Sequence, residues 1–117
     1  MKRNDRLTRS NDFQRVKQTG KSYAHPLLVL IKLSNPDGLL RIGVSAGKAV
    51  GNAVTRNRAK RRMRASLSGL IESIQPGWDL VFLARKPIVD AAFCDIIEAE
   101  IYLLKRAGLF LDESGRE

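Results

Sequence analysis

Two apolar runs of strand length flank a turn sequence in the first half of the chain. The runs cover residues 27–33 and 39–45, and the tetrapeptide NPDG at 35–38 separates them. Proline at the second turn position and a glycine that accepts a positive φ favour a tight reversal. The pattern predicts an antiparallel hairpin of these two runs. Shorter strands are expected at 22–24 and 79–84.

Apolar residues spaced three to four positions apart predict helices in the remaining segments. Ser10 is expected to cap a short helix through about residue 18, a long helix covers about 53–74, and Asp90 is expected to cap a third that stops at Gly108. Ser and Asp side chains accept hydrogen bonds from the free N–H groups of a first helical turn, and glycine commonly follows the last turn. The expected inward-facing residues are Phe13 and Val16, then Ala59, Met63, Leu67, Leu70 and Ile74, then Phe93, Ile97, Ile101 and Leu104.

The predicted order of elements is α-β-β-β-α-β-α, without an internal repeat or a low-complexity linker. This order indicates one mostly antiparallel sheet with helices packed on it, a two-layer α+β sandwich. A length of 117 residues suits a single domain, with a folded core at about 6–110 and short flexible termini. A hydrophobic share of 44% provides enough apolar surface for that core.

The chain is strongly basic, because 21 Lys and Arg residues against 12 acids give a formal net charge of +9. The charges are segregated along the sequence. Residues 38–71 carry basic side chains and no acid, whereas acids predominate after Pro87. A segregated basic surface points to a polyanionic partner, either nucleic acid or an anionic membrane surface.

The sequence argues against a membrane-spanning protein, a secreted protein and a zinc protein. The longest apolar run, 27–31, is far shorter than the roughly 20 residues that span a bilayer, and the N-terminus lacks the apolar segment of a secretory signal. Cys94 is the only cysteine, so it forms no internal disulfide, and with the single His25 it assembles no zinc site. We therefore expect a cytoplasmic protein, with Cys94 in the core and His25 in a turn.

The outer face of the long helix carries most of the chemistry. On a helical projection its arginines lie opposite the apolar stripe, and two like-charged pairs stand four residues apart, Arg58 with Arg62 and Lys60 with Arg64. A solvated helix face usually mixes signs at this spacing, because like pairs destabilise the helix. Guanidinium groups suit phosphate and base contacts better than ammonium groups. The pattern therefore favours a nucleic-acid surface over a merely solvated face.

The same helix contains the sequence RNRAKRRMR at 56–64, which resembles the RNRxKRxxR signature of the bacterial ribonuclease P protein subunit family. Neighbouring pieces agree in order and spacing: DF at 12–13, RIGVS at 41–45 followed by Lys48, GNAV at 51–54 and ARKP at 84–87. The resemblance covers residues 6–107. It implies a ribosomal protein S5 domain 2-like fold in which the long helix connects parallel strands by a left-handed crossover. Handedness rules alone would predict the right hand.

The resemblance also implies a function. Members of the family are the protein part of a ribonucleoprotein endonuclease that removes the 5′ leader of precursor tRNA, while the RNA subunit holds Mg²⁺ and performs the hydrolysis. One protein is expected per catalytic RNA, with no cofactor bound by the protein and no membrane contact. The residues agree with this division of labour, because a protein nuclease needs converging carboxylates or a histidine base. Here Asp95 and Glu98 fit the solvated face of the third helix.

The family pattern assigns two sets of contact residues. The cleft between the first helix and the sheet is expected to hold the single-stranded leader, with Phe13 as a stacking surface. Phe13 is equally well interpreted as a core residue, and Lys17 and Ile31 stand where other members often have aromatics. The RNA-subunit set is Lys48, Arg56, Asn57, Arg58, Lys60, Arg61 and Arg64; the leader set is Phe13, Lys17, Ile31, Arg56, Arg85 and Lys86.

Two other functions share the basic surface. A ribosomal or other structural RNA-binding protein would have the same charge and fold class without any role in a nuclease. A DNA-compacting protein would bind duplex DNA as tightly as structured RNA. No helix-turn-helix pair, zinc finger or basic zipper is present in the sequence, so base-specific readout is not expected.

Overall fold

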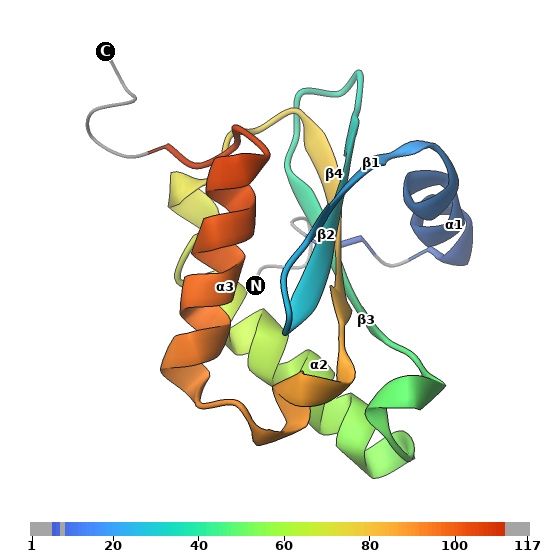
Figure 1. Cartoon of the computed structure of the whole chain (residues 1–117). Helices are drawn as coiled ribbons and strands as arrows, with labels where there is room; N and C mark the ends of the chain where they lie inside the picture. Colours follow the sequence, from blue (N-terminus) through green and yellow to red (C-terminus); the bar gives the residue numbers. More distant parts are fainter. Residues whose placement is uncertain (1–5, 8, 112–117) are drawn as a thin grey trace.

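The structure, a computed structural model, describes residues 6–7 and 9–111 (Figure 1). The order of its elements matches the predicted α-β-β-β-α-β-α, and the expected flexible termini lie outside the described residues. The elements are α1 (Ser10–Thr19), β1 (Lys21–Ala24), β2 (Leu28–Ser34), β3 (Arg41–Ala46), α2 (Ala53–Ser68), β4 (Trp78–Ala84) and α3 (Phe93–Arg106), with short 3₁₀ turns η2 (Lys48–Val50), η3 (Ile71–Ser73) and η4 (Lys86–Asp90).

The strand order is β1-β2-β4-β3, so the predicted hairpin of β2 and β3 is wrong. The turn itself forms: the N–H of Gly38 donates to Oδ1 of Asn35 at 3.1 Å, and Gly38 has φ 74°. However, β4 lies between the two strands, antiparallel to β2 and parallel to β3. Turn chemistry fixes a reversal of the chain but not its pairing partner. The central place goes to β4, whose buried residues 79–82 suit a strand covered on both faces.

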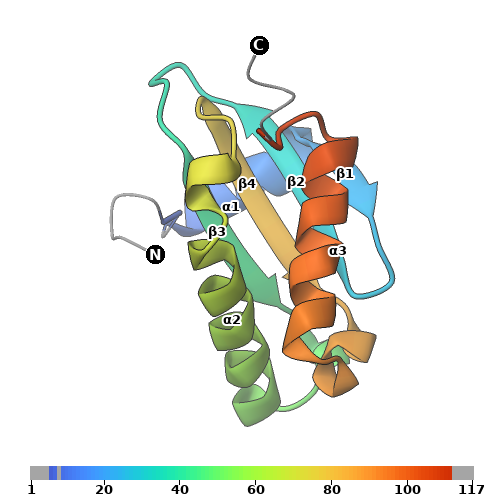
Figure 2. The same cartoon turned by 90° about the vertical axis from the view of Figure 1, so that its left-hand side faces the viewer.

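The connection from β3 through α2 to β4 is left-handed. In Figure 2 the helix lies in front of the sheet, both strands point downward, and the chain moves from β3 on the left to β4 on its right. Nearly all such crossovers are right-handed. The observed hand agrees with the family expectation and not with the general rule.

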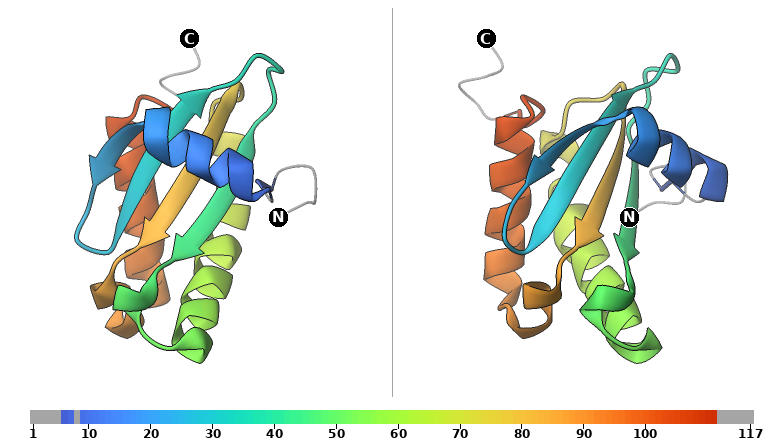
Figure 3. Two further views of the ribbon diagram at one scale, coloured as in Figure 1. Left: turned by 90° about the vertical axis from the view of Figure 1, so that its right-hand side faces the viewer. Right: turned by 45° about the vertical axis from the view of Figure 1, so that its right-hand side comes forward.

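Helices cover both faces of the sheet, α2 and α3 on one face and α1 on the other (Figure 3). The face under α2 and α3 carries the main core, which includes Met63, Phe82 and Leu103, all fully buried. The face under α1 carries a small separate cluster. This small cluster consists of Leu7, Val16, Ile31 and Val81, with Phe13, Val29, Leu33 and Leu83 packed against it. The predicted α+β class is confirmed.

Helix ends differ from the sequence predictions. α2 ends at Ser68 and not at residue 74, and the chain continues through η3. Asp90 belongs to η4, so Ala92 and not Asp90 precedes the first residue of α3. Cys94 is exposed, so the prediction of a core cysteine is wrong, and Phe93, which was expected to face inward, is 43% exposed. The buried face of α3 consists of Ile96, Ala99, Glu100, Leu103 and Leu104.

Candidate nucleic-acid interface

The start of α2 and its packing on the sheet decide which of its side chains form the basic surface. Oδ1 of Asn52 accepts a hydrogen bond from the N–H of Thr55 at 2.9 Å, which satisfies one of the free donors of the first turn. Ala59, Met63 and Leu67 are buried against the sheet, as the apolar stripe predicted. The opposite side of the helix is therefore turned to solvent. Asn57, Arg58 and Arg61 are exposed there, and Arg56, Lys60 and Arg64 are half-buried at its borders.

Arg62 is an exception on this helix. The wheel places it on the outer face, but its guanidinium donates to the carbonyl oxygens of Ile88 at 3.3 Å and Ala91 at 2.7 Å. Arg62 thus ties α2 to the segment between β4 and α3. Helical spacing alone could not reveal this contact, because its partners lie far along the chain.

Arg64 has a cationic neighbour, Arg6, which lies too far away in the sequence for helical spacing to reveal it. Arg6 forms an isolated parallel bridge with Ile42, and the N–H of Leu7 donates to the carbonyl of Ile42 at 2.8 Å, so the N-terminal segment runs along the edge strand β3. Partial burial, and then the positive charge of Arg6, lower the pKa of Arg64. Two guanidinium groups therefore face the same region. A phosphate placed between them would relieve their repulsion.

Lys48 and Lys86 extend the basic surface to one end of the sheet. Lys48 begins η2 and Lys86 begins η4, and these two turns pack against each other after β3 and β4. Arg85, by contrast, donates to the carbonyl of His25 at 3.3 Å, beside the β1–β2 turn. Buried Nε of Arg56 has no hydrogen-bond partner in the described part of the chain. The structure thus brings Lys48, Lys86 and the α2 residues close together and turns Arg85 toward another segment.

A hollow of about 360 Å³ opens between α1 and β3; we call it the α1 hollow. Phe13 is half-buried in it and lies against Gly43 of β3. A Cβ atom at residue 43 would collide with Cζ of Phe13, so glycine is required for this close approach. Lys60 of α2 also reaches the hollow. Its lining residues are Ser10, Phe13, Gln14, Lys17, Val44, Ser45, Ala46 and Lys60.

Of the predicted leader residues, only Phe13 and Lys17 line the α1 hollow, and Ile31 lies beneath it. Ile31 is 5% exposed and packs in the small cluster beneath α1. The strand period predicts which face of β2 it occupies, but only the position of α1 covers it. The α1 hollow therefore contains Phe13 and Lys17 of the predicted set, while Ile31 supports the helix from below.

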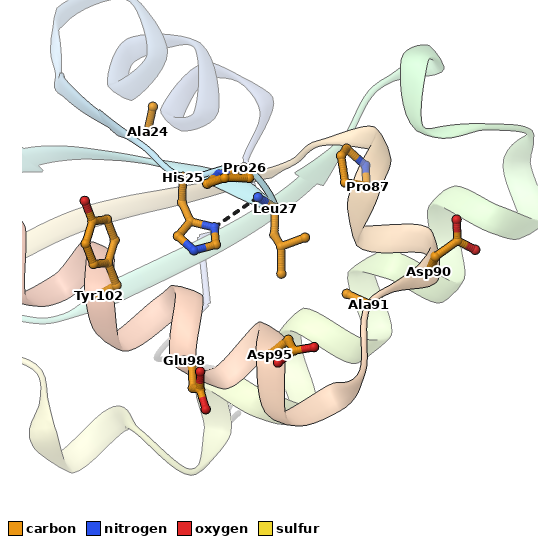
Figure 4. A pocket seen from close by; sticks show the side chains of 10 residues that line it. All are labelled: Ala24, His25, Pro26, Leu27, Pro87, Asp90, Ala91, Asp95, Glu98 and Tyr102. Carbon is orange, nitrogen blue, oxygen red and sulfur yellow. Dashed lines mark hydrogen bonds between the residues drawn. The ribbon is translucent and has the colours of Figure 1, made fainter.

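Three acids of the C-terminal third line a different hollow, of about 690 Å³ (Figure 4). Asp90, Asp95 and Glu98 line it together with His25 and Tyr102. His25 lies in the β1–β2 turn, as expected, and its Nδ1 accepts a hydrogen bond from the N–H of Leu27 at 3.0 Å. The negative charge here disfavours a polyanion. The basic surfaces of α1 and α2 suit a polyanion better.

Within residues 6–7 and 9–111, no three His, Cys, Asp or Glu side chains come together in a way that could hold a metal ion. In the same part of the chain, no helix is long and apolar enough to cross a membrane.

Fold and surface together define a small basic α+β domain whose surface has the character of a nucleic-acid interface, with an arginine face on α2 beside the α1 hollow. The family model described as Ribonuclease P matches residues 1–108. The ribonuclease P protein component of Clostridium botulinum is 42% identical over 111 residues, covering 94% of this chain and 99% of that protein. The corresponding protein of Herpetosiphon aurantiacus is 38% identical over 112 residues, covering 96% and 91%.

A solved structure agrees with these sequence relatives. The Staphylococcus aureus RNase P protein superposes with a TM-score of 0.80 at 32% identity, over 91% of this chain and 97% of that chain. The chain therefore belongs to the ribonuclease P protein family and functions in tRNA processing as part of a ribonucleoprotein.

Proposed function

We propose that α2 binds the catalytic RNA subunit of ribonuclease P and that the α1 hollow holds the 5′ leader of precursor tRNA. In this proposal the RNA subunit carries Mg²⁺ and hydrolyses the phosphodiester bond, leaving a 5′-phosphate on the tRNA. The protein acts in the cytoplasm, one copy per catalytic RNA. It contributes affinity and positioning, and it binds no cofactor itself.

The observation that carries this proposal is the continuity of the two surfaces through Lys60. This residue belongs to α2, between the exposed Arg58 and Arg61, and also lines the α1 hollow. An RNA strand in the hollow would therefore lie directly beside RNA bound on α2. Phe13 offers a ring surface that stacks on any base, and Lys17 places a cation near the strand backbone.

The positions of the carboxylates support a non-catalytic protein. Asp79 is fully buried among arginines, and Glu100 is fully buried between α2 and α3. The acids of the large hollow lie apart from the α1 hollow and share none of its lining residues. We therefore expect the chain alone to leave precursor tRNA uncut, whereas adding it to a bacterial ribonuclease P RNA at low Mg²⁺ restores 5′ maturation. An absence of stimulation would favour a structural RNA-binding protein instead.

The leader contact is tested by the affinity of the reconstituted holoenzyme for tRNAs with 5′ leaders of increasing length. Affinity should rise over the first nucleotides, reach a plateau once the hollow is filled, and gain less at high salt because Lys17 is screened. Phe13→Ala should remove about 1–3 kcal/mol of this gain, the contribution of one base stack. Gly43→Ala should act in the same direction, since a Cβ displaces the ring.

A matched aromatic control is available on α3. Phe93 is 43% exposed and lies outside the α1 hollow, so Phe93→Ala should leave the leader gain unchanged. Mature tRNA should bind all four proteins equally. If leader length has no effect on the wild-type holoenzyme, the leader role is lost and only the RNA-subunit contact of α2 remains.

A further inference from the structure

A buried carboxylate connects α1 to the sheet. Asp79 of β4 is fully buried, and its Oδ2 accepts a hydrogen bond from Nη2 of Arg15 at 2.6 Å. Arg15 lies on α1 and also comes within 3.5 Å of Asp12 one turn earlier. The contact joins residues 64 positions apart in the sequence. Charge-assisted hydrogen bonds of this length are among the strongest polar contacts in proteins.

The two oxygens of Asp79 serve different segments. Oδ1 accepts from Nδ2 of Asn35 and from Nε of Arg41, each at 3.0 Å. Asn35 follows β2, and Arg41 begins β3 and also pairs with Asp37 at 3.1 Å. Within the described residues, Oδ2 bonds only to Arg15. One oxygen therefore orders the sheet and its loop, and the other holds α1.

Few other contacts fix the middle of α1 on the sheet, whereas its ends continue into the segment that pairs with β3 and into β1. Val16 is the only fully buried residue of this ten-residue helix, and Phe13 adds a half-buried ring. The ends of α1 are fixed by these neighbouring segments, but two apolar side chains alone still allow the helix to rotate about its own axis over the sheet. The pair of Arg15 and Asp79 joins a buried carboxylate to a side chain that is 41% exposed, and its defined geometry restricts this rotation.

We propose that the Arg15–Asp79 pair is a positioning device that sets the place of α1 over the sheet and thereby the shape of the α1 hollow. Arg15 and Asp79 do not line the hollow, so a strand held in it would not touch them. They act through Phe13 and Lys17, which lie on the same helix and do line it. The inference rests on the proposed leader function and adds the residues that keep the hollow ready for single-stranded RNA before it binds.

The test compares Arg15→Met with Arg41→Met. Both remove one guanidinium from Asp79, but only Arg15 belongs to α1. In the reconstituted holoenzyme, Arg15→Met should reduce the affinity gain from a leader by about tenfold, the loss expected when one base stack no longer forms. Arg41→Met should leave that gain unchanged while lowering the thermal midpoint. Affinity for the RNA subunit, measured at one salt concentration, should stay the same in both.

Arg15→Lys supplies the conservative variant. It keeps the charge but loses the planar fork, so it should recover part of the leader gain. It also serves as the test if Arg15→Met proves too unstable to assay. Equal losses of leader gain in Arg15→Met and Arg41→Met, or no loss in either, would overturn the positioning role while leaving the leader function intact. A wild-type holoenzyme without any leader gain would overturn the leader function itself, and this inference with it.

Discussion

The two faces of the sheet each bury one acid, and the two acids are in opposite states. On the face of α2 and α3, burial, only partly opposed by a hydrogen bond from Ser66, raises the pKa of Glu100 to about 8. On the face of α1, burial alone would raise the pKa of Asp79, but hydrogen bonds from Arg15, Arg41 and Asn35 outweigh it and hold the pKa below its usual value. Glu100 is protonated at neutral pH, and Asp79 is ionised.

The hydrogen-bond geometry around Glu100 agrees with a protonated carboxyl group. Oγ of Ser66 lies 2.7 Å from Oε2 of Glu100 and 3.0 Å from the carbonyl oxygen of Met63. A hydroxyl group has one hydrogen and cannot donate to both. If the protonated carboxyl group of Glu100 donates a hydrogen bond to Oγ of Ser66, the Ser66 hydroxyl is free to donate its own hydrogen bond to the carbonyl oxygen of Met63. Both contacts are then satisfied.

The two faces of the sheet differ in what their side chains contribute to the fold. The face of α2 and α3 has a large apolar core, and its acid is neutral, so its stability comes from packing. The face of α1 has a small cluster and a charged network that specifies where the helix lies. In this protein the weaker face is the one that lines the proposed leader site.

Truncating one fully buried side chain on each face should show the difference in stability between the faces most strongly. Phe82 is fully buried in the main core, so Phe82→Ala should lower the free energy of unfolding by about 3–5 kcal/mol. Val16→Ala removes two buried methyl equivalents from the small cluster and should cost roughly 2 kcal/mol. Urea denaturation measures both. Equal losses would mean that the α1 face stabilises the fold as much as the main core.

Glu100 and Asp79 should change the stability of the protein with pH in opposite directions. Because the folded state holds the proton of Glu100 up to about pH 8, wild-type stability should fall as pH rises from about 4.5 to 8, by roughly 1.4 kcal/mol per unit at most. Glu100→Gln should remove this slope. Asp79 acts in the opposite sense, since its contribution is present above about pH 4 and is lost as pH falls through its lower folded pKa. Thermal midpoints of wild type and Glu100→Gln between pH 4 and 9 test this, and parallel curves would contradict a neutral Glu100.

The smallest expected effect on stability concerns the exposed arginines of α2. Arg58→Ala with Arg61→Ala should leave the free energy of unfolding almost unchanged but reduce the log–log salt slope of binding to the RNA subunit by about 0.7–0.9 for each lost phosphate contact. Arg62→Ala is the matched control on the same helix. It breaks two hydrogen bonds to backbone carbonyls, so it should lower stability and leave the slope unchanged. A reversed pattern would mean that Arg62 contacts the RNA.

The sequence predicts local features of this fold better than distant ones. Periodicity and the basic motif locate the elements and the arginine face of α2, because both depend on residues close in the chain. Strand order is not predictable in this way, since β4 enters between β2 and β3 from more than thirty residues away. The same reason hides the partners of Arg62 and Asp79, the burial of Ile31 and the exposure of Cys94. Each of these depends on which distant segment covers the residue.

The central place of β4 has a consequence for how the chain acquires its structure during synthesis. β2 and β3 are complete by residue 46, but neither can pair with its central neighbour until residues 78–84 have left the ribosome. The arginine-rich α2, which lies between β3 and β4 in the chain, therefore emerges before the sheet it packs on is complete. Contacts of such long sequence separation slow folding. A nascent chain halted before residue 78 should remain protease-sensitive, and one extended past the end of α3 should become resistant.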